Sequence, residues 1–385
     1  MDQTNQTKRG LVLSGGGARG AYQVGVLKAI SEMHKKHAPN PFQVITGTSA
    51  GAINAVALAA SANNFRLAVK KVEHLWTNLH VNNIYRAGYF DLLTSLVRIF
   101  FSLFNKGVGR SRPIALLDNS PLQELLQNVI QFRNIQKRID AGYLDAVSVN
   151  ATGFSSGESV TFFQGREELK SWRRYRRIGL PTELGVEHLM ASSAIPMIFP
   201  PQWVSREYFG DGALRQLAPV SPALRLGANR ILVIGVSGNP RKKLNLDTTV
   251  HSPSMASMVG HLFNSAFIDS LEHDLEIMQR FNELIGFVQN EAPYTSMGSM
   301  QLINLLAVYP SIEFDHLAAK HIKDLPRAMR HLMGRVGANE DGAGGSFASY
   351  LLFEPGFIQD LIKHGYQDAM DQRSAIEKFF LEDDI

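Results

Sequence analysis

Cysteine is absent from this sequence of 385 residues, which excludes disulfide bonds and metal sites with thiolate ligands. No His-x-x-x-His pair flanks a glutamate, so the common zinc-hydrolase pattern is missing as well. The sequence also has no internal repeat and no low-complexity tract. The polar residues 1–9 lead directly into a short strand, and so we expect no signal peptide, no transmembrane helix and a cytoplasmic chain that is at most peripheral to a membrane.

The composition is that of an ordinary globular protein, with 45% hydrophobic and 19% charged residues. Such a chain can bury a sizeable core, and its length is enough for one large domain or two smaller ones. The polar residues 239–243 are typical of a surface connector. We therefore predict a first domain over residues 8–240, which holds the motifs described below, and a helix-rich region over residues 241–385 that packs on it.

Helical spacing of apolar residues is the main signal in this second region. It predicts helices over residues 261–285, 317–336 and 357–380, and an apolar run predicts a strand over residues 302–309. The Met and aromatic positions favour a role in the core, and no chemistry can be read from them.

A serine-centred turn is the most informative motif of the chain. Residues 47–51 read Gly-Thr-Ser-Ala-Gly, directly after the apolar run 42–45 and directly before the small-residue helix 52–62. Glycine at both ends of the motif tolerates unusual backbone angles and leaves room for a substrate to approach. A strand, a sharp turn and a helix in this order predict a nucleophile elbow with Ser49 at its tip, and a plain glycine-rich turn is the alternative.

A second glycine cluster follows a predicted strand over residues 11–13. Residues 14–20 read Ser-Gly-Gly-Gly-Ala-Arg-Gly and lead into a predicted helix over residues 21–34. Successive glycine amides at a helix N-terminus form a nest for an anion, either a phosphate or the oxyanion of an acyl-transfer intermediate. Arg19 opposes the helix dipole there, which favours a nearby anion over a structural salt bridge that holds the loop.

The same loop matches the dinucleotide fingerprint through Gly15, Gly17 and Gly20. A dinucleotide site needs an acidic residue at the end of the second strand to bind a ribose hydroxyl, and no Asp or Glu lies between His34 and Gly51. No Gly-Lys-Ser/Thr follows the glycines, so the P-loop pattern fails too. A nicotinamide, flavin or nucleotide cofactor is therefore disfavoured.

The candidates for a proton acceptor are one aspartate and twelve scattered histidines. Asp211 lies between two glycines after an aromatic pair, a pattern typical of a tight turn or of an exposed catalytic carboxylate. Beside the serine elbow and the glycine nest, the catalytic interpretation is favoured. A triad would need a histidine after a late strand, but five histidines fall in helical patterns instead: His188, His261, His273, His316 and His331.

These motifs, in this order, resemble those of the patatin-like lipid acyl hydrolases, a family that includes plant patatins and the cytosolic phospholipase A type. The matching segments are residues 15–20, 47–51 and 211–213, and residues 191–196 and 119–122 are similar to two further family segments. The resemblance runs from about Lys8 to Gly238. One departure is minor, since Ala213 stands where many members carry glycine.

The resemblance implies an α/β fold, a three-layer sandwich with a central mixed sheet flanked by helices, and a helical C-terminal extension. It implies hydrolysis of a fatty-acyl ester in a phospholipid or lysophospholipid by a dyad in which Ser49 attacks the ester and Asp211 takes its proton. The implied anion nest or oxyanion hole, elbow glycines and dyad-supporting residues are Gly15, Gly16, Gly17, Arg19 and Gly20; Gly47 and Gly51; and Gly212 and Ala213. We expect no cofactor and no metal.

Two other functions stay open on the sequence alone. The same dyad could transfer the acyl group to an acceptor or hydrolyse a thioester. A chain of this kind could also be a catalytically inactive lipid-binding module, which is disfavoured because the nucleophile, the base candidate and the anion nest are all intact. The oligomeric state stays open.

Positive charge is concentrated in one segment of a chain whose net charge is +4. Arginine and lysine crowd residues 166–177, with Trp172 and Tyr175 between them. The segment fits a solvated face, a patch for anionic lipid head groups or, least well, a nucleic-acid surface. We expect a lipid partner with transient membrane contact and no nucleic acid.

The apolar segment 92–104 is a second candidate for membrane contact. As a helix it would be about 20 Å long, too short for a hydrocarbon core of about 30 Å, and Arg98 lies in its middle. Its polar residues gather on one narrow face, which suits an interfacial helix or a lid over an acyl-binding cleft. A buried core helix is the alternative.

Overall fold

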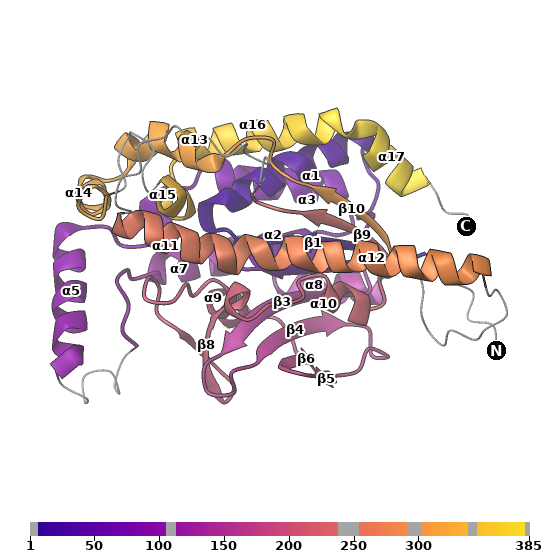
Figure 1. Cartoon of the computed structure of the whole chain (residues 1–385), viewed down its shortest axis with the longest axis horizontal. Helices are drawn as coiled ribbons and strands as arrows, with labels where there is room; N and C mark the ends of the chain where they lie inside the picture. The colour runs from indigo at the N-terminus through magenta and orange to yellow at the C-terminus, as the bar shows by residue number, and fades with distance from the viewer. Residues whose placement is uncertain (1–6, 105–112, 238–253, 292–301, 338–344, 382–385) are drawn as a thin grey trace.

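A mixed β-sheet forms the centre of the protein (Figure 1). The computed structural model describes residues 7–104, 113–237, 254–291, 302–337 and 345–381, which contain ten strands of this sheet. Five neighbouring strands are parallel, in the order β10-β9-β1-β2-β3, and the sheet continues through β4, β6 and β5. β8 pairs with β3 in antiparallel fashion and carries β7 on its other side. The strands are β1 (Arg9–Leu13), β2 (Val44–Thr48), β3 (Ala146–Gly153), β4 (Ser159–Gly165), β5 (Trp172–Arg174), β6 (Arg177–Pro181), β7 (Gln202–Val204), β8 (Glu207–Asp211), β9 (Arg230–Ile234) and β10 (Asn304–Val308).

Side chains of the parallel strands alternate between two helical layers, as the two-residue period of a strand requires. Leu11 and Leu13 belong to the core on one face, which includes α1 (Ala21–Met33), α2 (Ala50–Ala59) and α16 (Pro355–Asp371). Val12 belongs to a second core on the opposite face, with α10 (Ser221–Arg225) and α12 (Ser270–Glu291). The predicted three-layer fold, a mixed sheet flanked by helices, is confirmed.

Further helices surround these layers. They are η1 (Gly17–Gly20), α3 (Phe65–Thr77), α4 (Val81–Ile84), α7 (Ser120–Val129), α8 (Arg133–Asp140), α9 (Val186–Ser192), η2 (Gly212–Leu214), η4 (Ile322–Asp324) and α15 (Gly345–Leu351). The helices predicted after the two glycine motifs are present as α1 and α2.

The C-terminal region contributes to the same sheet. β10, within the strand predicted over residues 302–309, pairs in parallel with β9, and α16 packs along α1 (Figure 1). The pattern over residues 357–380 forms α16 and α17 (Arg373–Leu381). The predicted boundary at residue 240 lies outside the described residues and stays a prediction.

The two other predicted helical segments of this region are also divided. The pattern over residues 261–285 spans α11 (Met255–Asn264), a π-helical turn (Ser265–Asp269) and part of α12. The helical pattern over residues 317–336 is divided between α13 (Phe314–His321) and α14 (Arg327–Arg335). Pro326 lies between them and has no backbone N–H with which to continue a helix.

One helix stands apart from the body of the molecule. α5 (Tyr89–Phe104) projects at one edge (Figure 1), and large apolar side chains along it are exposed, among them Phe90, Leu93, Phe100 and Phe101. Leu92 is buried at its base. The segment is therefore not a buried core helix. Within the described ranges, we find no helix long and apolar enough to cross a membrane.

The basic segment 166–177 lies at the edge of the sheet that ends in β5 and β6. Arg173 forms an ion pair with Glu158 at 2.9 Å, and Arg166 forms one with Asp145 at 2.7 Å. Two acidic side chains of the protein thus neutralise part of the positive charge of this segment, which agrees with a solvated face.

Candidate active site

Ser49 occupies a strained turn at the carboxyl end of β2. β2 is buried along its whole length and α2 begins at Ala50, so the chain must change direction at a single residue. Ser49 has φ 54° and ψ −126°, a conformation that residues other than glycine rarely adopt. Strain of this kind persists only where the surrounding structure enforces it, and it is concentrated at functional sites.

Close backbone packing explains the two glycines of the elbow. A Cβ atom at Gly47 would lie 2.3 Å from the carbonyl oxygen of Gly51, and one at Gly51 would lie 2.3 Å from that of Leu13. No side chain fits at either position, so the ends of β1 and β2 and the start of α2 come into direct contact. The glycine loop after β1 and the serine after β2 therefore lie at the same edge of the sheet.

Buried polar groups beneath the turn hold the elbow in place. The Ser49 amide donates a hydrogen bond to Ser192 Oγ at 2.8 Å, and that hydroxyl donates to the Asn150 carbonyl at 2.6 Å. Asn150 Nδ2 donates to the Gly47 carbonyl at 3.0 Å. Ser192 belongs to the segment 191–196 that the family resemblance singled out, whereas sequence reasoning missed Asn150. The available signal was a set of polar residues in an otherwise apolar, fully buried strand, β3.

Asp211 lies at the end of β8, opposite Ala151 of β3, and its side chain is buried. Its Oδ1 accepts a hydrogen bond from the Ala213 amide at 3.0 Å. Gly212 packs against β3, where a Cβ atom would lie 2.2 Å from the Asn150 carbonyl. These contacts fix one carboxylate oxygen, and they leave Oδ2 buried and without a hydrogen-bond partner among the described residues.

Burial sets the proton affinity of this carboxyl. The pKa of Asp211 is raised from 3.8 to about 7, because desolvation by burial outweighs the Ser49 side chain and the Ala213 amide, which lower the pKa. The Ser49 hydroxyl thus lies close enough to act on the carboxyl, although no formed hydrogen bond joins the two. A small adjustment of either side chain would give Oδ2 its missing donor.

The glycine loop lies beside the serine. A Cβ atom at Gly15 would be 3.1 Å from Ser49 Cβ, and Gly20 packs against Ala50 in the same way at 2.8 Å. Gly17 has φ 56°, and a Cβ atom there would be 2.2 Å from the Tyr350 carbonyl. In the part of the chain that the structure describes, no backbone hydrogen bond is recorded from the amides of residues 15–17.

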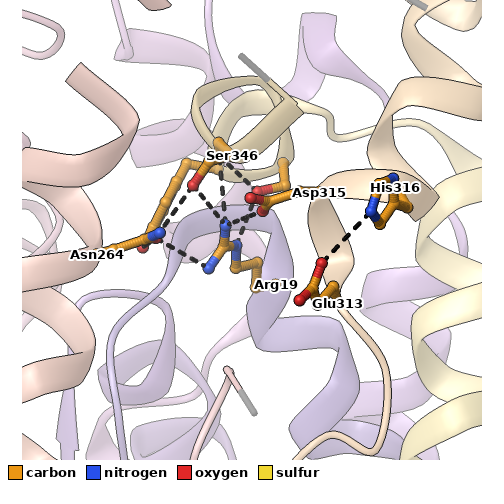
Figure 2. Close-up of polar contacts among 8 residues, drawn as sticks. Arg19, Asn264, Glu313, Asp315, His316 and Ser346 are labelled. Carbon is orange, nitrogen blue, oxygen red and sulfur yellow. Dashed lines mark hydrogen bonds and ion pairs between the residues drawn. The ribbon is translucent and has the colours of Figure 1, made fainter. Parts of the chain in front are cut away.

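Arg19 turns away from this loop toward the C-terminal helices (Figure 2). Its side chain is buried; Nη2 forms an ion pair with Asp315 at 3.1 Å, Nε donates to Ser349 Oγ at 2.7 Å, and Nη1 donates to Asn264 Oδ1 at 3.4 Å. The guanidinium also lies 4.2 Å from the ring centre of Tyr350. The preferred interpretation of Arg19 as an anion ligand is therefore corrected, because its donors hold the glycine loop to α11, α13 and α15.

An apolar cavity opens directly beside Ser49. Gly17 and Ser49 border it, and the other lining residues are almost all apolar, among them Ile53 of α2, Trp76 of α3, Leu122 of α7 and Tyr350 of α15. The cavity is narrow, with a volume of about 40 Å³. Its apolar lining suits the first methylene groups of an acyl chain whose carbonyl carbon lies at Ser49, and its volume is too small for the rest of such a chain.

No histidine among the described residues lines this cavity or the second one that adjoins Asp211. The buried His188 has a structural role instead, since its Nδ1 accepts a hydrogen bond from the Gly185 amide at 3.0 Å at the start of α9. Burial lowers the pKa of His188, which keeps the ring neutral at that position.

The sequence profile of the Patatin-like phospholipase family matches residues 11–224, more than half of the chain. The protein therefore belongs to the patatin-like phospholipase family. All the motifs assembled here around Ser49 and Asp211 lie within the matched residues.

Two curated relatives show how far the similarity extends. The chain is 27% identical over 219 residues to a cGAMP-activated phospholipase of Escherichia coli (strain TW11681), an alignment that covers 54% of this chain and 52% of the relative. It is 52% identical over 54 residues to Lysophospholipase nte1 of Aspergillus terreus (strain NIH 2624 / FGSC A1156), which covers 14% of this chain and 3% of that protein. The chain thus spans about half the length of the first relative and a small part of the second.

Solved structures with detectable similarity are more distant. VipD from Legionella pneumophila has a TM-score of 0.30 at 14% identity, with 93% of this chain and 67% of VipD covered. Human GIVD cytosolic phospholipase A2 has a TM-score of 0.39 at 10% identity, with 99% of this chain and 63% of that chain covered.

Proposed function

We propose that this protein is a lipid acyl hydrolase of the phospholipase A or lysophospholipase type, with Ser49 as nucleophile and Asp211 as general base. The observation that carries the proposal is the pairing of a serine on a strained elbow with a buried carboxyl of pKa about 7 that has an unpartnered oxygen. The names of the two curated relatives, a phospholipase and a lysophospholipase, support a lipid ester as the substrate.

The first half of the proposed reaction forms an acyl-serine. Asp211 Oδ2 takes the Ser49 proton while Ser49 Oγ attacks the ester carbonyl, and the oxyanion that forms is stabilised by the amides of residues 15–17. A base with a pKa near 7 suits this step better than an ordinary aspartate, because its proton affinity is matched to neutral pH. When the tetrahedral intermediate collapses, Asp211 returns the proton to the leaving alcohol.

The second half releases the fatty acid. Water attacks the acyl-serine, Asp211 takes a proton from that water, and the proton returns to Ser49 Oγ as the carboxylic acid leaves. The small apolar cavity beside Ser49 receives the first methylene groups of the acyl chain in both halves, and the rest of the chain lies outside it. Acyl transfer and thioester hydrolysis use the same intermediate and differ in the acceptor or in the leaving group.

The exposed helix α5 supports action at a lipid surface. Its side chains between Phe90 and Phe101 present an apolar face to the outside, and the helix is too short to span a bilayer. We infer that α5 lies in the membrane interface while the catalytic serine draws on lipid from the same surface.

Hydrolysis of phospholipid vesicles by purified wild-type protein and a Ser49→Ala variant tests the proposal. We expect released fatty acid with wild type and none with the variant, and a serine-directed fluorophosphonate should label only the wild type. A folded Ser49→Ala protein that still releases fatty acid would remove Ser49 as nucleophile. A wild type that binds vesicles but neither reacts with fluorophosphonate nor releases fatty acid would instead be a lipid-binding module.

A further inference from the structure

Ser193, directly after α9, carries a buried hydroxyl that has no hydrogen-bond partner among the described residues. The backbone of the same residue is fully engaged. Its amide donates to the Leu189 carbonyl at 3.0 Å, and its carbonyl accepts from the Ile195 amide at 3.0 Å. The residue is therefore held in place while its side chain lacks a partner. An unpaired buried hydroxyl is destabilising, so this one calls for an acceptor that the described chain does not supply.

The neighbours of Ser193 hold the two residues of the proposed dyad. Ser192 Oγ accepts a hydrogen bond from the Ser49 amide at 2.8 Å, and the Ala194 carbonyl accepts one from the Asp211 amide at 2.9 Å. Three consecutive residues thus contact the nucleophile, carry the unpartnered hydroxyl and contact the base. This turn places Ser193 at the dyad.

Ser193 also lines the small apolar cavity beside Ser49. Two other lining side chains carry a polar group, Trp76 and Tyr350, and these groups donate to asparagine side chains at 2.7 and 3.0 Å. Among the described residues, the Ser193 hydroxyl is therefore the buried, unpartnered donor of this cavity. Of the buried groups without a partner, Asp211 Oδ2 lies in the same way on the second cavity, which adjoins it.

The proposed reaction offers this hydroxyl one acceptor. If Ser49 and Asp211 act as proposed, the oxygen of the leaving alcohol lies at the Asp211 carboxyl, which returns a proton to it. The acyl half begins in the cavity that Ser193 borders, and the oxygen of that half is the carbonyl oxygen. Because this oxygen gains negative charge when Ser49 attacks, a donor aimed at it binds the transition state more strongly than the substrate.

We propose that Ser193 is a further catalytic residue, whose hydroxyl donates a hydrogen bond to the carbonyl oxygen of the substrate and of the acyl-serine. The Ser193 proton stays on its own oxygen throughout, and Asp211 alone carries the transferred proton. This proposal rests on the proposed hydrolase function and adds a side-chain donor to the amides of residues 15–17.

Two adjacent serines give a matched test in the full-length protein. We expect Ser193→Ala to lower kcat for p-nitrophenyl butyrate at least about tenfold. Its urea midpoint should be no lower than that of wild type, because no hydrogen bond of the described structure is lost. Ser192→Ala should lower the midpoint, since it breaks the bonds to the Ser49 amide and the Asn150 carbonyl. A smaller loss of kcat in Ser193→Ala, or a midpoint that falls as in Ser192→Ala, would overturn the proposal.

A transition-state analogue separates a donor from a residue with a purely structural role. An octyl trifluoromethyl ketone accepts Ser49 Oγ at its carbonyl carbon and forms a tetrahedral adduct with a charged oxygen. We expect Ser193→Ala to weaken inhibition by this ketone by the same factor by which it lowers kcat/KM. Equal inhibition of wild type and variant would show that Ser193 does not contact this oxygen.

Ser193→Cys separates the hydroxyl from the space that it fills. The thiol occupies a similar volume and is a weak donor, so we expect kcat at least about tenfold below wild type here too. Wild-type activity in Ser193→Cys would overturn the proposal, because the side chain would then only fill space. A wild type that cleaves no ester or phospholipid would contradict the proposed function itself, whereas an active wild type with fully active Ser193 variants would contradict only the added donor.

Discussion

Burial of the Asp211 carboxyl sets the pH range in which the proposed base can work. Desolvation raises its pKa from 3.8 to about 7, and only the ionised carboxylate can accept the Ser49 proton. We therefore expect kcat/KM for a soluble p-nitrophenyl ester to rise with pH, with a midpoint near 7, and then to level off. An assay over the range from about pH 5 to about pH 9 measures that midpoint. A midpoint near 4 would show a carboxyl of ordinary proton affinity and would contradict this account of the base.

The same burial costs stability once the carboxyl is ionised. Its pKa in the folded protein lies above the ordinary value of 3.8, so its contribution to stability is complete below about pH 4 and is lost as pH rises through about 7. We expect Asp211→Asn to raise the free energy of unfolding at pH 8 by on the order of 1–4 kcal/mol while removing activity. Urea unfolding at pH 8 and at pH 5 measures the change, which should shrink at the lower pH.

Asp145→Asn is the matched control for that measurement. Asp145 is also buried, but Lys8 and Arg166 pair with it at 2.8 and 2.7 Å. Removing its charge leaves those cations without their partner, so we expect this variant to be less stable than wild type at pH 8. If both variants are less stable than wild type at pH 8, the charge of Asp211, like that of Asp145, stabilises the folded protein, which would contradict this account.

At the scale of elements, Arg19 links the glycine loop to helices about 300 residues further along the chain. The Arg19–Asp315 pair spans 296 positions, and Asp315 is partly exposed whereas Arg19 is buried. Arg19→Met removes the donors of the buried Ser349 hydroxyl and of several partly buried acceptors, and we expect it to cost about 2–4 kcal/mol in the free energy of unfolding. Asp315→Asn should cost less, on the order of 1–3 kcal/mol, because the buried guanidinium loses its carboxylate but keeps its neutral acceptors Ser349 and Asn264. Full stability of Arg19→Met with complete loss of activity would favour the anion-ligand role instead.

The exposed helix α5 allows a test of membrane contact with little effect on the fold. Burying a Phe side chain at an interface contributes about 1.5–3 kcal/mol, so two of them change partitioning by tenfold or more. We expect Phe100→Ser with Phe101→Ser to reduce vesicle sedimentation by at least tenfold and to lower phospholipid hydrolysis, with turnover of a short soluble ester retained.

The control for this pair is Leu67→Ser, which alters an exposed apolar side chain on α3. Its vesicle binding should match wild type. Normal vesicle binding by the folded double variant of α5 would place the contact elsewhere, with the basic segment 166–177 as the next candidate.

At the scale of the whole molecule, sequence reasoning succeeded where the signal is local. The elbow around Ser49 and the glycine loop are each encoded within a few consecutive residues, and alternating burial of apolar residues gives the layered sheet. Contacts between distant segments were not predictable in this way. The Ser192 hydroxyl accepts a hydrogen bond from an amide 143 positions away in the chain. The partners of Arg19 lie in helices whose sequence pattern predicts only a role in the core. A single sequence gives periodicity along the chain but not which faces meet, so the cavities beside Ser49 and Asp211 and the contacts of Arg19 needed the structure.

The most direct test of the account is whether Ser49 and Asp211 act as one unit. Residual kcat/KM for a p-nitrophenyl ester is measured for Ser49→Ala, Asp211→Asn and the double variant, all confirmed as folded by circular dichroism. Residues of a single catalytic unit show losses that do not add, so we expect the double variant to be no slower than the slower single variant. Multiplied losses in the double variant, or substantial activity in a folded Asp211→Asn protein, would contradict the dyad.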